Sequence, residues 1–139
     1  MIHQTKTIVT SGYFDPLHVG HLECLELAKQ LGDKLIVIVN SDLQAKLKKG
    51  ESFMKEEDRM RIVSALKCVD HAFLSIDKDK SQCETLRYIK PDIFAKGGDR
   101  TSGEIPESKV CKELGIHIVD GLGEKIRSSS DLTGLKEIK

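Results

Sequence analysis

The segment from residue 7 to residue 31 constrains the fold most, because it joins an apolar, β-branched run to a helical pattern through a short turn. The run Thr7-Ile8-Val9-Thr10 predicts a strand, and apolar residues at helical spacing over 19–31 predict a helix with one apolar face. Ser11 and Gly12 end the strand. Small residues there let a phosphate approach the backbone amides, with the N-terminus of the next helix aimed at it. The segment therefore predicts a strand–turn–helix unit with an anion site at the turn.

The alternation of strand and helix continues along the rest of the chain. Strands are predicted at 7–12, 35–40, 72–76, 92–96 and 116–120, and helices at about 19–31, 56–67, 81–90, 106–114 and 129–138. Strand 35–40 is apolar throughout, as a central parallel strand buried on both faces should be. The pattern predicts an α/β fold, a Rossmann-like open parallel five-stranded sheet with helices on both faces. We expect residues 1–139 to form a single domain.

Composition excludes several classes of function. The 22 basic and 22 acidic residues give a formal net charge of zero, so no basic field attracts nucleic acid. With two Tyr, four Phe and no Trp, the chain has no aromatic platform for stacking bases. The N-terminus lacks the apolar stretch of a signal peptide, and no apolar run approaches the length that crosses a bilayer. The four cysteines form no C-x-x-C. We therefore expect a cytoplasmic protein without nucleic-acid or membrane partners.

His18 and His21 are the strongest candidate catalytic residues. They stand three residues apart at the start of the predicted helix 19–31, so both project from one face toward the same site. Two imidazoles there can donate hydrogen bonds to phosphoryl oxygens as charge builds up on them. A single histidine in this position would more often cap the helix or pack in the core. The combination of a glycine turn with H-x-G-H is more specific and favours the catalytic interpretation.

The segment Gly12-Tyr13-Phe14-Asp15-Pro16-Leu17-His18-Val19-Gly20-His21 resembles the signature G-x-F-D-x-x-H-x-G-H of the nucleotidyltransferase superfamily. Within it the chain is similar to the small cytidylyltransferases and the heptose-phosphate adenylyltransferases. The resemblance extends from about Thr7 to about Ile138. It implies transfer of a nucleotidyl group from a nucleoside triphosphate to a phosphorylated acceptor, with release of pyrophosphate. It also assigns Gly12, Tyr13, Phe14 and Gly20 to the nucleotide site.

A basic segment follows strand 35–40. Residues 44–52 contain Lys46, Lys48 and Lys49, are weakly periodic, and are expected to form a mobile loop. Such a loop is often only a solvated surface, but a lysine on it can also close over bound phosphates. In the enzymes that the chain resembles, a lysine here contacts the triphosphate. The pattern N-S-D-x-x-x-K matches Lys46 best, with Lys48 and Lys49 as the other candidates.

Arg59 follows the acidic residues Glu56, Glu57 and Asp58, which suit the N-terminus of helix 56–67. One interpretation of Arg59 is a surface ion pair with Glu56. The enzymes that the chain resembles carry an arginine here that is directed into the active site. We favour this second role for Arg59.

The string Lys96-Gly97-Gly98-Asp99 follows strand 92–96. Gly98 lets the backbone pass close to a ligand, and Asp99 can hold a ribose hydroxyl or organise a metal-bound water. By itself the string could be only a turn. It closely resembles the corresponding string of the heptose-phosphate adenylyltransferases.

The last motif precedes helix 129–138. Ser128, Ser129 and Ser130 could cap that helix or present hydroxyls and amides to the β- and γ-phosphates, the role that the resemblance implies. The glycerol-phosphate cytidylyltransferases have an arginine five positions before the first hydroxyl, where this chain has Gly123. If a cation is required, Lys125 or Arg127 must supply it, and Arg127 joins the predicted nucleotide site.

The predicted reaction is in-line attack by an acceptor phosphate or phosphonate oxygen on the α-phosphorus of a nucleoside triphosphate. Such an acceptor is already anionic, so catalysis depends on alignment and charge neutralisation. His18 and His21 would stabilise the α-phosphoryl transition state, while Lys46, Arg59 and the serines 128–130 hold the triphosphate. Mg²⁺ is expected to bridge phosphate oxygens and to keep several waters, without dedicated protein ligands.

Three alternatives remain open at this point. CTP with a small phosphate- or phosphonate-bearing acceptor is marginally favoured over ATP with a sugar 1-phosphate. An archaeal-type adenylyltransferase that forms a flavin nucleotide would use the same histidines. A non-catalytic nucleotide sensor is a hypothesis of another class.

Related small nucleotidyltransferases generally pair, so we expect a homodimer in which a partner covers Phe53 and Met54.

Overall fold

The computed structural model describes residues 5–96 and 105–119. In chain order the elements are β1 (Thr7–Gly12), α1 (Val19–Lys29), β2 (Lys34–Val39), α2 (Asp42–Lys49), α3 (Glu56–Ser64), β3 (His71–Leu74), α4 (Cys83–Ile89), β4 (Ile93–Ala95), α5 (Glu107–Leu114) and β5 (His117–Val119). The predicted strands are all present: β1 has the predicted bounds, and the ends of the other strands are shifted by one or two residues. The predicted helix 129–138 lies outside the described residues.

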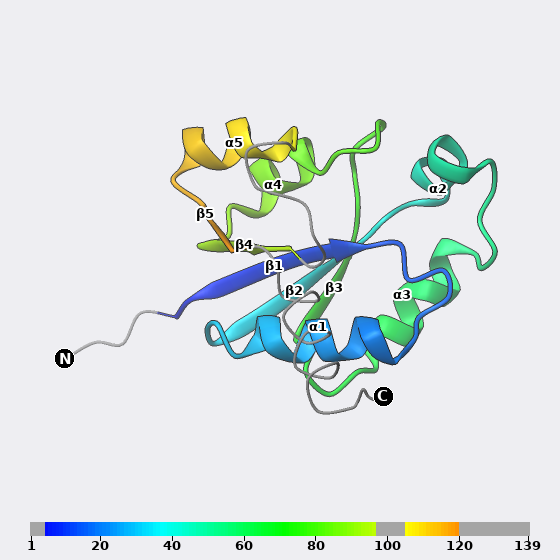
Figure 1. The fold of residues 1–139 in the computed structure, drawn as a ribbon, viewed down its shortest axis with the longest axis horizontal. Helices are drawn as coiled ribbons and strands as arrows, with labels where there is room; N and C mark the ends of the chain where they lie inside the picture. The colour runs from blue at the N-terminus through cyan, green and yellow to red at the C-terminus, as the bar shows by residue number, and fades with distance from the viewer. Residues whose placement is uncertain (1–4, 97–104, 120–139) are drawn as a thin grey trace, which may run out of the picture.

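The strands form one parallel sheet in the order β3-β2-β1-β4-β5, so the first strand of the chain is the central one (Figure 1). β1 pairs with β2 along its whole length, from Thr7 opposite Lys34 to Gly12 opposite Val39. From β1 the chain moves outward through β2 to β3, and it then crosses to β4 and β5 on the other side. The predicted Rossmann-like parallel sheet is confirmed.

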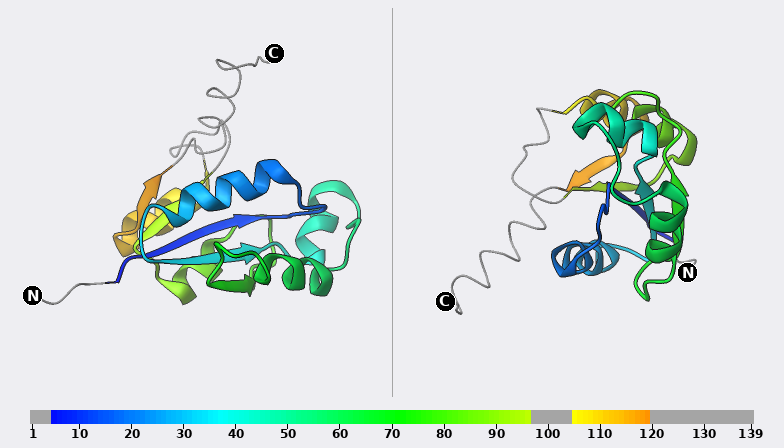
Figure 2. Two further views of the ribbon diagram at one scale, coloured as in Figure 1. Left: turned by 90° about the horizontal axis from the view of Figure 1, so that it is seen from below. Right: turned by 90° about the vertical axis from the view of Figure 1, so that its right-hand side faces the viewer.

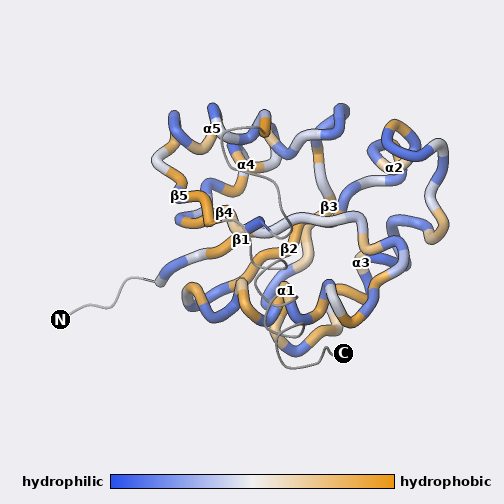
Figure 3. The backbone as a smooth tube through the Cα atoms, viewed as in Figure 1, coloured by the Kyte–Doolittle hydropathy of each residue, from blue (hydrophilic) through white to orange (hydrophobic). Residues whose placement is uncertain are grey.

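Helices cover both faces of the sheet, α1 and α3 on one and α4 and α5 on the other (Figures 1 and 2). The hydropathy pattern of β2 accounts for this, because hydrophobic residues follow one another along β2 (Figure 3) and its alternate residues pack into two different clusters. Leu35, Val37 and Val39 belong to a buried cluster that includes Leu25 of α1 and Val63 of α3. Ile38 belongs to a second cluster, with Leu86 of α4 and Val110 of α5.

The segment after β2 differs from its prediction. Residues 44–52 were expected to form a mobile loop, but Asp42–Lys49 form helix α2. A reciprocal capping box starts it: the Gln44 N–H donates to Ser41 Oγ at 3.2 Å, and the Ser41 N–H donates to Gln44 Oε1 at 3.0 Å. Gly50 ends α2 with a φ of 95°, a conformation that suits glycine.

Across residues 5–96 and 105–119, none of the helices has the length and apolar character needed to span a membrane.

Candidate active site

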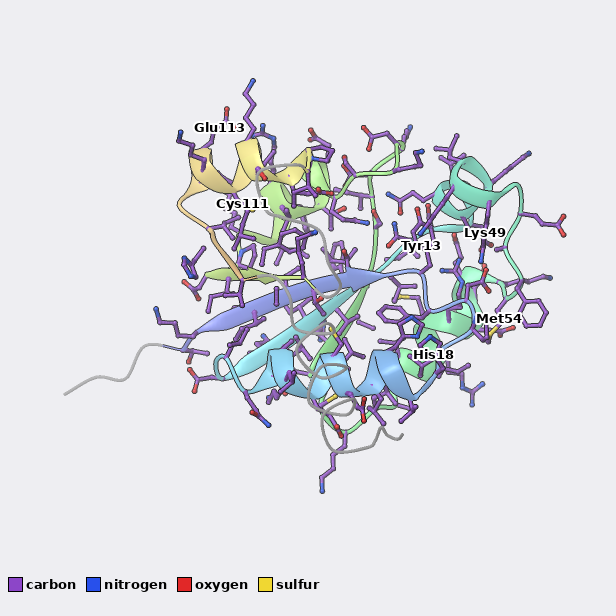
Figure 4. All side chains as sticks on the ribbon, in the orientation of Figure 1. Tyr13, His18, Lys49, Met54, Cys111 and Glu113 are labelled. Atoms are coloured by element: carbon purple, nitrogen blue, oxygen red, sulfur yellow. The ribbon has the colours of Figure 1, made fainter. Side chains whose placement is uncertain are left out.

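The candidate site lies at the carboxyl ends of the central strands. The strands that follow β1 in the chain lie first on one side of it (β2, β3) and then on the other (β4, β5). Ligands of such sheets bind at the carboxyl end of the strand where this order reverses, the switch point. The turn after β1 leads directly into α1. In Figure 4, Tyr13, His18, Lys49 and Met54 gather at this end of the sheet, whereas Cys111 lies away from it on α5.

His18 and His21 stack at the start of α1, with ring centroids 3.9 Å apart and planes inclined by 27°. The Gly20 N–H donates to Nδ1 of His18 at 3.1 Å, and the His18 N–H donates to Nδ1 of His21 at 3.2 Å. Because each Nδ1 accepts a hydrogen bond, each neutral ring carries its proton on Nε2. No hydrogen bond within the described residues occupies either Nε2. The two histidines therefore cap the helix with one nitrogen and can donate to a ligand with the other.

The surroundings of His21 favour its neutral form. Burial, and then the charge of His18, lower the pKa of His21 from its ordinary value of 6.5. The ring of Phe14 meets that of His21 edge to face, with centroids 5.2 Å apart and planes at 78°. A neutral His21 with its proton on Nε2 can donate a hydrogen bond while its Nδ1 continues to cap the helix.

Glycine is needed in the turn for close packing. A Cβ on Gly12 would lie 2.7 Å from Cζ of Phe14, and a Cβ on Gly20 would lie 3.0 Å from Cε1 of His18. Phe14 is buried and has a positive φ of 52°. The sequence interpretation gave the glycine at position 12 to a phosphate approaching the strand end. That role stays a prediction, and the structure adds a second reason for glycine at position 12, since the Phe14 ring fills the space that a side chain there would need.

Asp15 links the turn to the segment between α2 and α3. Its side chain is fully buried, and its carboxylate accepts the N–H groups of Phe53 at 2.7 Å and Met54 at 2.6 Å. The same carboxylate pairs with Nζ of Lys49 at 2.8 Å. Burial by itself would raise the pKa of Asp15, but the three donors outweigh it and hold the pKa below 3.8. Sequence reasoning missed this role, and the only available signal was the position of Asp15 inside the motif.

Arg59 is fully buried beneath the turn and connects four segments. Its Nε donates to the carbonyl of Met54 at 2.9 Å, and one terminal nitrogen donates to the carbonyls of Tyr13 at 2.9 Å and Asn40 at 2.6 Å. The other terminal nitrogen pairs with Asp42 at 2.7 Å. Arg59 thus joins the ends of β1 and β2 to the starts of α2 and α3.

These contacts rule out the first of the two interpretations of Arg59, a surface ion pair with Glu56. Arg59 pairs with Asp42, and the Arg59 side chain is buried. Glu56 instead accepts a hydrogen bond from the Asp42 N–H at 2.7 Å. The structure therefore gives Arg59 a positioning role, and its contact with substrate stays a prediction. Its partners Asn40, which is buried, and Asp42, which is partly exposed, were visible in the sequence only as polar residues at a strand end.

Two of the three α2 lysines face the turn. Nζ of Lys48 lies 4.4 Å from the ring centroid of Tyr13, and Lys49 pairs with Asp15. Lys46, which the resemblance favoured as the triphosphate contact, is exposed to solvent on α2. Its role stays a prediction. Lys48 and Lys49 are the lysines that contact the turn between β1 and α1, residues 13–18, which we call the histidine turn.

The remaining site predictions fall on residues whose placement is not described. These are Gly98 and Asp99 after β4 and, near the C-terminus, Arg127, Ser128, Ser129 and Ser130. All of them lie outside residues 5–96 and 105–119.

Known proteins resemble this chain over most of its length. A family model described as cytidylyltransferase-like matches residues 9–129. Bifunctional protein HldE of Helicobacter pylori (strain Shi470) is 40% identical over 113 residues, which cover 80% of this chain and 24% of that protein. Bifunctional protein HldE of Syntrophotalea carbinolica is 42% identical over 112 residues, covering 78% of this chain and 22% of that protein.

A solved structure shows the same fold. The lipopolysaccharide core biosynthesis protein from Thermoplasma volcanium GSS1 has a TM-score of 0.72 and 30% identity, and the match covers 84% of this chain and 96% of that one. A parallel sheet with an H-x-G-H turn at its switch point is the arrangement that the resemblance to nucleotidyltransferases predicts. The chain belongs to the cytidylyltransferase-like family. It spans about a quarter of the length of the HldE relatives that it matches.

Proposed function

We propose that the chain catalyses transfer of a nucleotidyl group from a nucleoside triphosphate to a small phosphate-bearing acceptor, with release of pyrophosphate. The observation that carries this proposal is the pair of stacked imidazoles beside the end of β1, each with Nδ1 engaged by the backbone and Nε2 available as a donor. Donors fixed before the reaction stabilise developing charge without reorganisation. Family membership supports the same reaction class.

In the proposed step, an acceptor oxygen forms a bond to the α-phosphorus while the bond from that phosphorus to the bridging oxygen of the β-phosphate breaks. Pyrophosphate leaves with the electron pair. The Nε2–H groups of His18 and His21 would donate to the α-phosphoryl oxygens and to the leaving oxygen. Lysines of α2 would neutralise the β- and γ-phosphates, with Lys46 the residue that the family resemblance favours.

Mg²⁺ is the expected cofactor, and the donor set suits an ion carried by the nucleotide. The carboxylates of Asp15 and Asp42 are engaged by Lys49 and Arg59, respectively. In the part of the chain that the structure describes, no group of three or more His, Cys, Asp or Glu could hold a metal ion. We propose that phosphate oxygens and water supply the ligands, an arrangement that Mg²⁺ commonly adopts, and that the ion neutralises phosphate charge.

We propose ATP as the nucleotide and a sugar 1-phosphate as the acceptor. The sequence marginally favoured CTP, but the comparisons support the adenylyltransferase alternative better. Two of the matched relatives are bifunctional HldE proteins, and a similar structure is a lipopolysaccharide core biosynthesis protein. The string Lys96-Gly97-Gly98-Asp99 also resembles the heptose-phosphate adenylyltransferases.

A panel of the four nucleoside triphosphates, crossed with phosphorylated acceptors in the presence of Mg²⁺, tests both parts of this proposal. Pyrophosphate release is the measurement. We expect release with ATP and a sugar 1-phosphate, and weaker release with CTP. Release only with CTP would overturn the nucleotide assignment. Nucleotide binding without release for any acceptor would favour a non-catalytic sensor.

Two further properties belong to the proposal. We propose a cytoplasmic location, which the free thiols of Cys24, Cys68, Cys83 and Cys111 support. We also propose a homodimer, which the 78% exposed side chain of Phe53 supports.

A further inference from the structure

Helix α2, which carries the three lysines, is held in place mainly by polar contacts. Gln44 and Ala45 are its buried residues, while Leu43 and Leu47 are about half exposed. The helix lies at the rim of the molecule beyond the ends of the strands (Figure 1). Because apolar burial is small here, side-chain hydrogen bonds must set the position of α2.

Gln44 makes the central contact of this kind. Its side chain is fully buried, and Nε2 donates to the carbonyls of Asp79 at 2.8 Å and Ser81 at 3.0 Å. Its Oε1 accepts the Ser41 N–H of the capping box. Both amide hydrogens and the amide oxygen therefore have partners, and the amide bridges α2 to a loop 35 residues further along the chain.

The loop whose carbonyls accept the Gln44 hydrogen bonds is itself held by other hydrogen bonds. The N–H and the Oγ–H of Ser81 donate to Oδ1 of Asp79 at 2.9 and 2.7 Å. The next residue, Gln82, donates its N–H to the buried carboxylate of Glu107 on α5 at 2.7 Å. Gln44 is thus bound to a part of the protein whose position is fixed independently of α2.

The directions of Lys48 and Lys49 are tied to those of the two buried residues of α2 by helical spacing. Gln44 and Lys48 are four residues apart, as are Ala45 and Lys49, so each buried residue has a lysine one turn beyond it. Lys48 and Lys49 are the lysines that contact Tyr13 and Asp15. The bonds of the Gln44 amide therefore hold the rotation of α2 at which these lysines face the histidine turn.

We propose that Gln44 is a positioning residue for nucleotide binding, which fixes α2 so that its lysines meet the triphosphate. This role rests on the proposed nucleotidyltransferase function. Gln44 would not touch the nucleotide. Its loss should therefore weaken nucleotide binding more than it slows the chemical step at saturating nucleotide.

Gln44→Glu is the sharpest variant. It preserves the volume of the side chain and the oxygen that accepts the Ser41 N–H, but it places an oxygen against the two carbonyls of the loop. Gln44→Ala is the second variant, since it removes the amide with a residue of high helix propensity and decides the question if Gln44→Glu does not fold. Leu43→Ala is the matched control, because Leu43 is a half-exposed neighbour on the same helix.

Calorimetric titration with MgATP, and separately with MgCTP, measures binding, and pyrophosphate release measures turnover. For Gln44→Glu or Gln44→Ala we expect the Kd and KM for the nucleotide to rise on the order of tenfold, with a much smaller change in kcat. Trypsin should cleave after Lys46, Lys48 and Lys49 faster than in the unmodified chain. Leu43→Ala should bind the nucleotide normally.

Unchanged nucleotide affinity in a folded Gln44 variant, with the unmodified chain binding normally, would overturn the positioning role alone. An equal loss in Leu43→Ala would also overturn it, since any disturbance of α2 would then suffice. Failure of the unmodified chain to bind either nucleotide would overturn the proposed function and this role with it.

Discussion

At the scale of single residues, the substitution His18→Asn separates helix capping from catalysis. An asparagine oxygen can accept the Gly20 N–H as Nδ1 of His18 does, but the Nε2–H donor is lost. We therefore expect kcat to fall roughly a hundredfold or more, while the thermal midpoint stays close to that of the unmodified chain. Initial rates of pyrophosphate release and a circular-dichroism melt provide the two measurements.

His21→Ala should lower kcat by a similar factor, roughly a hundredfold, although it also removes a capping contact. His18→Asn keeps its own capping contact, so it shows how far kcat falls when a histidine donor is lost without the loss of a cap. Near-normal turnover of a well-folded His18→Asn protein would exclude His18 from catalysis and leave it a capping residue.

The pKa of His21 predicts how stability depends on pH. Burial and the neighbouring His18 lower this pKa in the folded state, so the unfolded chain binds the proton more readily. The contribution of neutral His21 is fully present above pH 6.5 and is lost as the pH falls through the lower folded-state pKa. Urea titrations between pH 7.5 and about pH 5 should show stability decreasing toward acid. The decrease should be shallower in His21→Ala, and identical slopes would contradict the assignment.

Sequence reasoning found the histidines but not the residues that hold their turn. A helical spacing of three predicts that His18 and His21 share a face, because that relation is local. The buried contacts of Asp15 and Arg59 join residues that are far apart in sequence, such as Arg59 and Tyr13, which are 46 positions apart. No local pattern encodes such a pair, and the charge of Arg59 made an exposed side chain the natural alternative.

At the scale of elements, α2 shows where pattern reasoning fails. Its lysines and half-exposed leucines produce a weak apolar face, so periodicity favoured a loop. The capping signal Ser41-x-x-Gln44 was nevertheless present in the sequence and would have predicted a helix start. The helix is held by polar bonds to other segments, which hydropathy does not report.

Arg59 acts between elements, and its replacement tests that role. Arg59→Lys keeps a positive charge but cannot reproduce bonds to the carbonyls of Met54, Tyr13 and Asn40 together with the pair to Asp42. These carbonyls, one buried and two partly buried, would lose their donors, so we expect the free energy of unfolding to fall by about 3 kcal/mol. Urea denaturation at neutral pH measures this loss.

Arg61→Lys is the control for Arg59→Lys, because Arg61 is exposed on the same helix. Its free energy of unfolding should change by no more than about 0.5 kcal/mol. Full stability of Arg59→Lys together with impaired nucleotide binding would contradict the positioning role and assign Arg59 to substrate contact.

At the scale of the whole molecule, the architecture was predictable because one strand is apolar on both faces. A β2 buried on both sides requires helices on both faces, and connections through helices make the neighbouring strands parallel. The order β3-β2-β1-β4-β5 then places the turn after β1 at the switch point. Nucleotide choice was not predictable in this way, since it depends on backbone groups and pocket shape rather than on the strand pattern.

Phe53 is the exposed residue through which we expect two copies of the chain to pair. Phe53 is 78% exposed in the segment between α2 and α3, which Asp15 holds in a fixed position through the N–H groups of Phe53 and Met54. A fixed, exposed aromatic side chain suits a symmetric contact between two copies. Sedimentation across micromolar concentrations should therefore give twice the chain mass of 15.5 kDa, and Phe53→Ser should shift the equilibrium toward the monomer. Tyr88→Ser, at a 69% exposed site on α4, is the control and should leave the dimer unchanged. A single species at the chain mass, or equal effects of the two substitutions, would contradict pairing through this segment.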